Sequence, residues 1–254
     1  MLIPSAMLYG EERGRLSEDH RAVYHLGWSG VPAARVTADV LWFGPELRLV
    51  GRGQTMGIAR GLFTLDAAYH SHIRVKDFLP VHSVLEETYP ERHQVITLDF
   101  SATRAVYRRV DTPADEKHRV ATLRHANIRD LFSGLMAYRA RPLREGDVET
   151  LVVCQGDRLY LATLQVDAHR DRRIAGRVWP TIECSLKLER ILDDGSLEPH
   201  KKFKSASAWL TNDHHRHLLR IEAQVFVGKI FAELRTLEPL TGSALEEARK
   251  AATR

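Results

Sequence analysis

The chain has 254 residues, of which 44% are hydrophobic and 28% are charged, a balance that suffices for a globular protein with an apolar core. Its formal net charge is only +4, and acidic residues are interspersed with the basic ones, which argues against a nucleic-acid-binding protein. No apolar run reaches the length of about 18 residues that a membrane-spanning helix needs.

The densest basic runs are residues 169–173 (HRDRR) and 200–204 (HKKFK). Both are short, and we interpret them as solvated turns rather than as a site for a polyanion. The sequence therefore predicts no nucleic-acid partner.

The chain opens with MLIPSAMLYGEE (residues 1–12), which is apolar and then turns acidic. This segment has neither a basic start nor a full-length apolar stretch, so it does not form an intact signal peptide, although it fits the end of a truncated one. We assign residues 1–19 to an N-terminal extension.

From residue 20 onward, apolar and polar residues alternate with a period of two, the pattern of half-buried β-strands. In the first run, Tyr24, Leu26 and Trp28 share one face, and SGVP (29–32) supplies the following turn. Further runs of strand length continue to residue 110, including one over residues 61–75. This regular spacing predicts an antiparallel meander.

One helix interrupts the strands, over residues 127–143 (NIRDLFSGLMAYRARPL). Apolar residues recur there at helical spacing, Asn127 or Asp130 can cap the start, and Pro142 ends it. Gly134 costs this helix about 1 kcal/mol relative to alanine, so tertiary packing must hold it.

Strand-like runs resume at residue 148 and continue to residue 237. The tail, residues 241–254, has Ser243 and Glu246 at capping-box spacing and predicts a short exposed helix. We therefore expect one β-rich domain over residues 20–240 and a helical tail over residues 241–254.

The predicted fold is mainly β. Because long meanders twist and curl, we expect a strongly curved antiparallel sheet, open or closed like a barrel, wrapped around one central helix. The short C-terminal helix lies outside this arrangement.

Four segments, in this order, resemble the bacterial family known as domain of unknown function 3108. They are YHLGWSGVPAARVTADV, LFTLDAAYHSHIRVKDFLPVHSVLEE, IRDLFSGLMAYRARPLREGD and AWLTNDHHRHLLRIEAQVFVGKIFAEL. The resemblance covers roughly residues 20 to 238, and it departs from the family pattern at Thr211 and Asn212, where Ser and Asp are usual. It implies an exported, β-rich protein of the periplasm or cell envelope, and it implies no reaction.

The last of these segments holds His214, His215 and His217 beside Asp213. A catalytic zinc site needs three protein ligands on rigid elements, and a hairpin tip does not supply them by itself. We interpret the stretch as a polar hairpin turn formed by Asn212, Asp213 and Arg216, and we predict no metal and no cofactor.

A second histidine pair, His70 and His72, alternates onto one face of a strand. Two imidazoles at this spacing can chelate a metal, but no third ligand is evident, so we interpret them as surface histidines.

Six apolar or aromatic side chains are placed on inward faces by the strand and helix patterns. We predict that they are core residues, and that some of them line a groove for an acyl chain. They are Trp28, Trp42, Phe63, Phe132, Met136 and Tyr138.

The two cysteines, Cys154 and Cys184, both fall in strand-like runs. In an oxidising compartment they would form a disulfide, and in a reducing one they would be two buried thiols. The sequence leaves both possibilities open.

Taken together, these features favour a non-enzymatic envelope protein that binds a hydrophobic ligand such as a lipid, or that serves as a scaffold. The alternative is a hydrolase acting on envelope glycans or lipids. Its site would contain Asp213 with His215 and His217, or Glu86.

Overall fold

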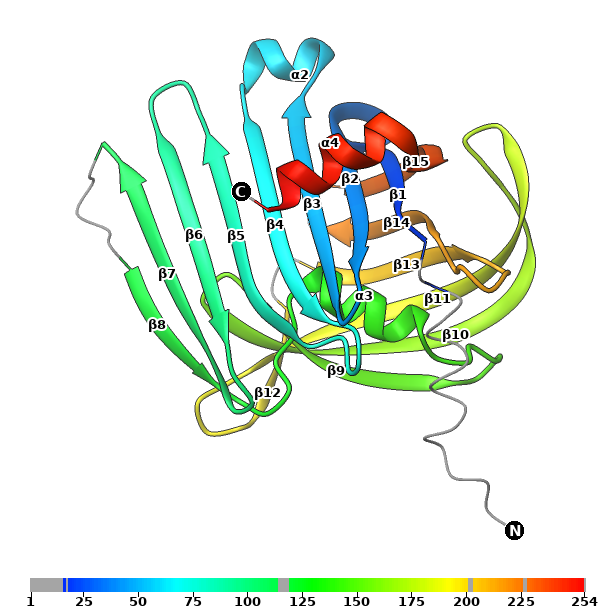
Figure 1. Ribbon diagram of the computed structural model, residues 1–254. Coiled ribbons are helices and arrows are strands. Elements are labelled where there is room, and N and C mark those ends of the chain that lie inside the picture. The colour runs from blue at the N-terminus through cyan, green and yellow to red at the C-terminus, as the bar shows by residue number, and fades with distance from the viewer. Residues whose placement is uncertain (1–15, 17, 114–118, 201–202, 226–227, 254) are drawn as a thin grey trace.

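A computed structural model describes the chain except for residues 1–15, 17, 114–118, 201–202, 226–227 and 254. Within the described residues, 15 strands form one antiparallel sheet that curves strongly (Figure 1). The prediction of a mainly β, antiparallel fold is confirmed. Most of the N-terminal extension, and Lys201 and Lys202 of the second basic run, lie outside the described residues.

The first eight strands form one meander, in which each strand pairs with the next. They are β1 (His20–Trp28), β2 (Val31–Phe43), β3 (Glu46–Thr55), β4 (Asp66–Arg74), β5 (Pro80–Thr88), β6 (His93–Phe100), β7 (Arg104–Thr112) and β8 (Arg119–Arg124).

The remaining strands form a second meander, with the short strand β12 attached to β11. They are β9 (Val148–Gln155), β10 (Arg158–Ile174), β11 (Arg177–Ile191), β12 (Leu197–Pro199), β13 (Phe203–Thr211), β14 (Leu218–Val225) and β15 (Gly228–Pro239).

The two meanders join where β1 pairs with β15, so that His20 lies opposite Pro239. The strand order then runs from β8 through β1 and β15 to β9, and these two edge strands do not pair with each other. The sheet is therefore open rather than a closed barrel. The segment that follows β8 reaches the other edge, where Arg129 forms an isolated parallel bridge with Val153 on β9.

Helix α3 (Leu131–Arg139) forms where the sequence predicts a helix. Its N-cap is Asp130, whose carboxylate accepts a hydrogen bond from the Ser133 amide at 2.7 Å. Met136 packs in one apolar cluster with side chains of β2 and β3, while Tyr138 packs in another cluster with side chains of β9, β10, β11 and β13. This helix thus contacts both halves of the sheet.

The two faces of β2 serve two different helices. Val40 belongs to the cluster that contains Met136 of α3, and its neighbour Leu41 belongs to a cluster with Ala248 and Ala252. These alanines are on α4 (Gly242–Ala252), which Figure 1 shows crossing the other face of the sheet. The predicted short C-terminal helix is therefore present and most of its residues are exposed, but it is anchored to the sheet through these two buried alanines.

The structure corrects three local predictions. Residues Gly57–Leu62 form a short helix, α2, so the strand expected over residues 61–75 begins only at Asp66. The basic run 169–173 lies within β10 and is not a turn, because the chain reverses later, after Ile174. The N-cap of α4 is Thr241 rather than Ser243.

Among the described residues, no helix is long and apolar enough to cross a membrane. The division of the chain into an extension, one domain and a tail stays a prediction.

Candidate functional site

A cavity of about 270 Å³ lies between α3 and the face of the sheet that α3 covers. Its walls come from β1, β2, β3, β14, β15 and α3, and most of its lining side chains are apolar. For scale, an apolar cavity of about 150 Å³ holds benzene. The cavity can therefore take a larger apolar group, such as part of an aliphatic chain.

Small side chains on neighbouring strands leave this space open. Ala22 on β1 lies directly opposite Ala38 on β2, and both are buried. Ala232 on β15 lies opposite Leu26 on β1, and all four residues line the cavity. A larger side chain at Ala22 or Ala38 would project into the cavity, so these alanines determine its volume.

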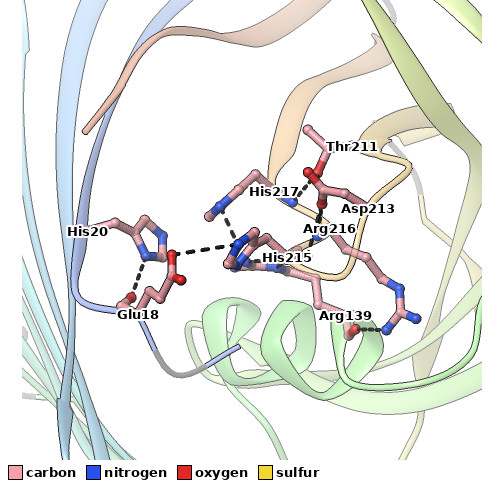
Figure 2. A network of polar contacts seen from close by, with 8 residues as sticks. All are labelled: Glu18, His20, Arg139, Thr211, Asp213, His215, Arg216 and His217. Carbon is pink, nitrogen blue, oxygen red and sulfur yellow. Dashed lines mark hydrogen bonds and ion pairs between the residues drawn. The ribbon is translucent and has the colours of Figure 1, made fainter. Parts of the chain in front are cut away.

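Arg139, the last residue of α3, makes one end of the cavity polar. This arginine is only 4% exposed. Its Nε and Nη2 donate to the carbonyl oxygen of His215 at 3.2 and 2.7 Å, and its Nη2 lies 3.4 Å from Nδ1 of His217. Its Nη1 donates to Sδ of Met136 at 3.3 Å, a weak acceptor. Figure 2 shows the histidines gathered at this end of α3.

The contacts of the Arg139 guanidinium are therefore with neutral acceptors. In the described part of the chain, no carboxylate oxygen comes within the 4.0 Å that defines an ion pair with this side chain. Burial lowers its pKa to about 10, so the group remains a cation at pH 7.

Two neutral histidines stand beside this cation. The rings of His20 and His217 meet edge to face at 4.8 Å, and Nδ1 of His20 lies 2.8 Å from the carbonyl oxygen of Glu18. Burial lowers the pKa of His20 to about 4 and that of His217 to about 2, and repulsion from Arg139 acts in the same direction. Both rings are uncharged at pH 7, and Arg139 carries the positive charge.

The hairpin between β13 and β14 positions His215 and His217. At its tip, Oδ1 of Asp213 accepts hydrogen bonds from Oγ1 of Thr211 at 2.7 Å and from the amides of His215 and Arg216 at 3.0 and 2.9 Å. Arg216 adopts a left-handed conformation with φ of 47°. The Asp213 carboxylate thus organises the turn, a role that its position in the sequence suggests.

Two further bonds attach this hairpin to its surroundings. The amide of Asn212 donates to the carbonyl oxygen of Pro180 at 2.9 Å. Nη1 of Arg216 donates to the carbonyl oxygen of Arg139 at 2.6 Å. The second bond fixes the hairpin against the C-terminal end of α3.

The histidines of the hairpin contact one another, with ring centroids 3.9 Å apart for His214 and His215 and 5.2 Å apart for His215 and His217. Nevertheless, the described residues contain no group of three or more His, Cys, Asp or Glu side chains that could hold a metal ion. Glu86, the other candidate of the hydrolase hypothesis, lies elsewhere, in a cavity that the end of α4 also lines. The structure therefore brings Asp213, His215 and His217 together on the hairpin and places Glu86 at a separate location.

The second histidine pair lies in that same cavity near α4. His70 and His72 on β4 are joined there by His82 on β5, and the rings of His72 and His82 are 6.5 Å apart. Nδ1 of His82 contacts Oδ1 of Asp99 at 2.7 Å. His70 and His72 are partly buried rather than fully exposed.

The six predicted lining residues are divided by the structure. Phe132 and Met136 line the cavity beside α3. Tyr138 is buried in the cluster on the other side of α3, and Trp42 packs on the cluster of β2 and β3, but neither lines the cavity. Trp28 and Phe63 are 52% and 54% exposed. Their predicted inward orientation is wrong, because Trp28 ends β1 and Phe63 follows the exposed helix α2.

A protein-family model, "Protein of unknown function (DUF3108)", matches residues 23–235. The chain belongs to this family. No curated protein matches it in sequence. Among solved structures, it resembles a β-barrel-like protein of the DUF1849 family from Brucella abortus, with a TM-score of 0.57 and 9% identity over 89% of this chain and 99% of that one. This likeness concerns the fold alone.

Two other solved structures are less similar to this DUF3108 member. An exported protein with a YmcC-like fold from Bacteroides fragilis gives a TM-score of 0.38, with 7% identity over 87% of this chain and 96% of that one. The Mycobacterium tuberculosis lipoprotein LppX gives a TM-score of 0.29, with 14% identity over 93% of this chain and 94% of that one.

The two cysteines of this DUF3108 member are buried free thiols, so the disulfide considered from the sequence is absent. On β10, the partner of Cys154 is Leu159 and the partner of Cys184 is Val166, which is 166 − 159 = 7 positions further along. At about 3.3 Å per residue the two cysteines are offset by about 23 Å along the strands. A disulfide needs Cα atoms about 4.4–6.8 Å apart.

We therefore expect both thiols to react in the unfolded protein. Labelling under denaturing, non-reducing conditions should modify Cys154 and Cys184 in protein isolated from any compartment, since the geometry prevents their pairing. A mass that shows an intramolecular disulfide would contradict the strand register. Burial also raises the pKa of Cys184 to about 11, so its labelling in the folded protein should be slow.

Arg139, His20 and the cavity-lining alanines Ala22, Ala38 and Ala232 are not among the site residues predicted from the sequence. One signal was available, because Arg139 follows Met136 by three residues and so shares its face of the predicted helix. A cation on the buried face of a helix is rare enough to mark a site. No local sequence pattern marks His20, Ala22 and Ala38 as site residues. They come together around the cavity only through the pairing register of β1 and β2.

Proposed function

We propose that this DUF3108 member binds a hydrophobic ligand, an acyl or other aliphatic chain, in the cavity beside α3, and that it does so without catalysing a reaction. The observation that supports this proposal is the volume of about 270 Å³ lined mainly by apolar side chains. Each CH₂ group transferred from water contributes about 0.8 kcal/mol. A chain of several such groups can therefore bind without a polar sequence motif.

We further propose that α3 is the central helix around which the sheet curves. Met136 and Ala137 on one side and Tyr138 on the other are buried in two different apolar clusters. Without these contacts, both clusters would lose a wall. In this proposal, α3 supports the cavity as well as lining it.

The proposed location is the periplasm or cell envelope, where lipid chains are abundant. Fractionation of bacteria that produce the full-length protein tests this part. Release of the protein with the periplasmic contents, or with the membranes, supports it, whereas recovery with a cytoplasmic marker enzyme contradicts it.

Filling the cavity tests the proposed ligand site. In Ala38→Leu, the larger side chain projects from β2 into the space that Ala22 leaves on β1. We expect binding of a fluorescent fatty-acid analogue to weaken by at least about tenfold, because two displaced CH₂ groups already correspond to about 1.6 kcal/mol. Stability should hold, since the added atoms enter empty space instead of an already packed core.

A matched variant, Ala121→Leu, adds the same atoms on β8, outside the cavity, and should bind like the wild type. Equal affinities of the wild type and Ala38→Leu for the fatty-acid analogue would show that the ligand binds outside this cavity. Absence of binding by the wild type, together with no lipid in organic extracts of the native protein, would remove the carrier function and leave a scaffold role.

A further inference from the structure

The cavity beside α3 has a buried positive charge at one end, and in the described protein no carboxylate lies within ion-pair distance of it, although Asp213 attracts it from further away. We propose that it selects amphiphiles with an anionic head group, a carboxylate or a phosphate, which Arg139 binds while the aliphatic chain occupies the apolar part. This inference rests on the proposed function and adds the chemical class of the ligand.

Arg139 lies at the border between the apolar and the polar part of the cavity. It ends α3 at the point where the lining changes from Leu135 and Met136 to His20 and His217. The guanidinium therefore borders the same space as the apolar side chains. A ligand that fills the cavity with its chain brings its head group to this border.

The charge of Arg139 is buried. Burying an ionised group is unfavourable unless an opposite charge and hydrogen bonds compensate for the lost water. Arg139 is 4% exposed, and its hydrogen-bond partners in the described protein are a carbonyl oxygen, an imidazole nitrogen and a thioether sulfur. Asp213 attracts it without forming an ion pair, so an anion brought by a ligand would supply the direct charge pairing that Arg139 lacks.

The guanidinium of Arg139 can form further hydrogen bonds with a ligand. A guanidinium has five N–H donors in a planar fork, which matches the oxygens of a carboxylate or a phosphate. Nη1 of Arg139 reaches only Sδ of Met136, at 3.3 Å, among the described residues. A sulfur is a weak acceptor, so this end of the fork would gain from an oxygen.

The imidazole of His217 lies next to Arg139, and its protonation state determines what it offers a ligand. Nδ1 of His217 faces Nη2 of Arg139, which only donates, so Nδ1 accepts and the proton of the neutral ring is on Nε2. His217 therefore adds a donor at this end and no negative charge. Two carboxylates lie near this end: Glu18 approaches Nε2 of His215 at 3.6 Å, and Asp213 attracts Arg139 without an ion-pair contact.

A series of ligands with one chain and different head groups tests the inference on the full-length protein. Dodecanoate, dodecyl phosphate, dodecanol and dodecyltrimethylammonium compete at pH 8 against a bound fluorescent probe. We expect the two anions to bind at least about tenfold more tightly than dodecanol, and the cation to bind most weakly. The ratio between the two anions distinguishes a carboxylate site from a phosphate site.

Substitutions at Arg139 then test whether this residue causes the preference for anionic head groups. Arg139→Gln removes the charge and should bring the ratio of the affinities for dodecanoate and dodecanol to about one. Arg139→Lys keeps the charge and should retain part of the preference. Arg141→Gln removes a guanidinium two positions later, outside the cavity, and should keep the wild-type ratio.

The failures of the two proposals are distinguishable. Equal affinities of the wild type for dodecanoate and dodecanol overturn the anionic head group and leave the hydrophobic site. Binding of none of the four ligands overturns the proposed function and this inference together. If Arg139→Gln also loses dodecanol, then Arg139→Lys decides, and a lysine variant without any anion preference overturns the inference.

Discussion

Lowering the pH from 7 to 5 should destabilise the folded protein by about 2 kcal/mol through His20 alone. Burial holds the pKa of His20 at about 4 in the folded state, against 6.5 for the unperturbed group. The unfolded chain therefore binds more protons below pH 6.5, and unfolding becomes easier as the pH falls toward 4. His217, with a pKa of about 2, acts in the same direction.

The charged and titratable groups that surround His20 come from three segments. Arg139 of α3 and His215 of the β13–β14 hairpin disfavour its protonation, and Glu18 before β1 favours it. The depressed pKa means that burial and the two disfavouring neighbours outweigh Glu18. Protonation of His20 therefore lowers the stability of the folded state little well above pH 6.5. The free energy of unfolding falls as the pH drops from 6.5 toward 4, and below the folded pKa of about 4 this effect levels off.

Urea unfolding of the wild type and of His20→Asn at pH 7 and pH 5 measures this effect. The asparagine amide can replace the Nδ1 donor that faces the carbonyl oxygen of Glu18, but it does not titrate. We expect the stability of the variant to change with pH by about 2 kcal/mol less than that of the wild type. His125→Asn, at an exposed position, should follow the wild-type curve. Parallel curves for wild type and His20→Asn would show that His20 is accessible to protons.

Replacing Tyr138 with alanine should cost about 3–5 kcal/mol of folding free energy, the usual cost of removing a large aromatic side chain from a core. Tyr138 is 2% exposed and packs with Leu151, Val153 and Ile182. Its hydroxyl donates to Sγ of Cys184 at 3.3 Å. Removing the Tyr138 ring would therefore open a cavity where α3 meets the second meander.

Two further variants separate the ring from its surroundings. Tyr138→Phe removes only the hydroxyl and should cost about 1 kcal/mol, because one hydrogen bond to sulfur is lost. Leu131→Ala truncates a residue of the same helix that is 55% exposed, and it should change stability by less than about 1 kcal/mol. A cost below about 1 kcal/mol for Tyr138→Ala, measured by urea unfolding, would contradict the role of α3 as the central helix.

Much of the fold is predictable from the sequence, because strands with one buried face have a strict period of two. The alternation around Val36, Ala38 and Val40 locates β2, and Asp130 before an apolar helical stretch locates the start of α3. The family resemblance agrees with the family model over residues 23–235. These signals are local, and each is present within a dozen residues.

The missed features depend on contacts between distant segments. The pairing of β1 with β15 brings residues near both ends of the chain together, and no local pattern encodes it. Trp28 and Phe63 are aromatic and therefore resemble core residues, yet a strand end and a short exposed helix place them at the surface. The cavity itself arises where alanines from β1 and β2 coincide, and a single alanine in a strand has no such meaning.

The proposed function requires an aliphatic chain in the space between α3 and β1–β3. The decisive measurement is a crystal structure of the protein grown with dodecanoate. We expect continuous density between Ala22, Ala38 and Met136, with the carboxylate next to Arg139. A cavity closed by the surrounding side chains, with dodecanoate bound elsewhere or not at all, would contradict it.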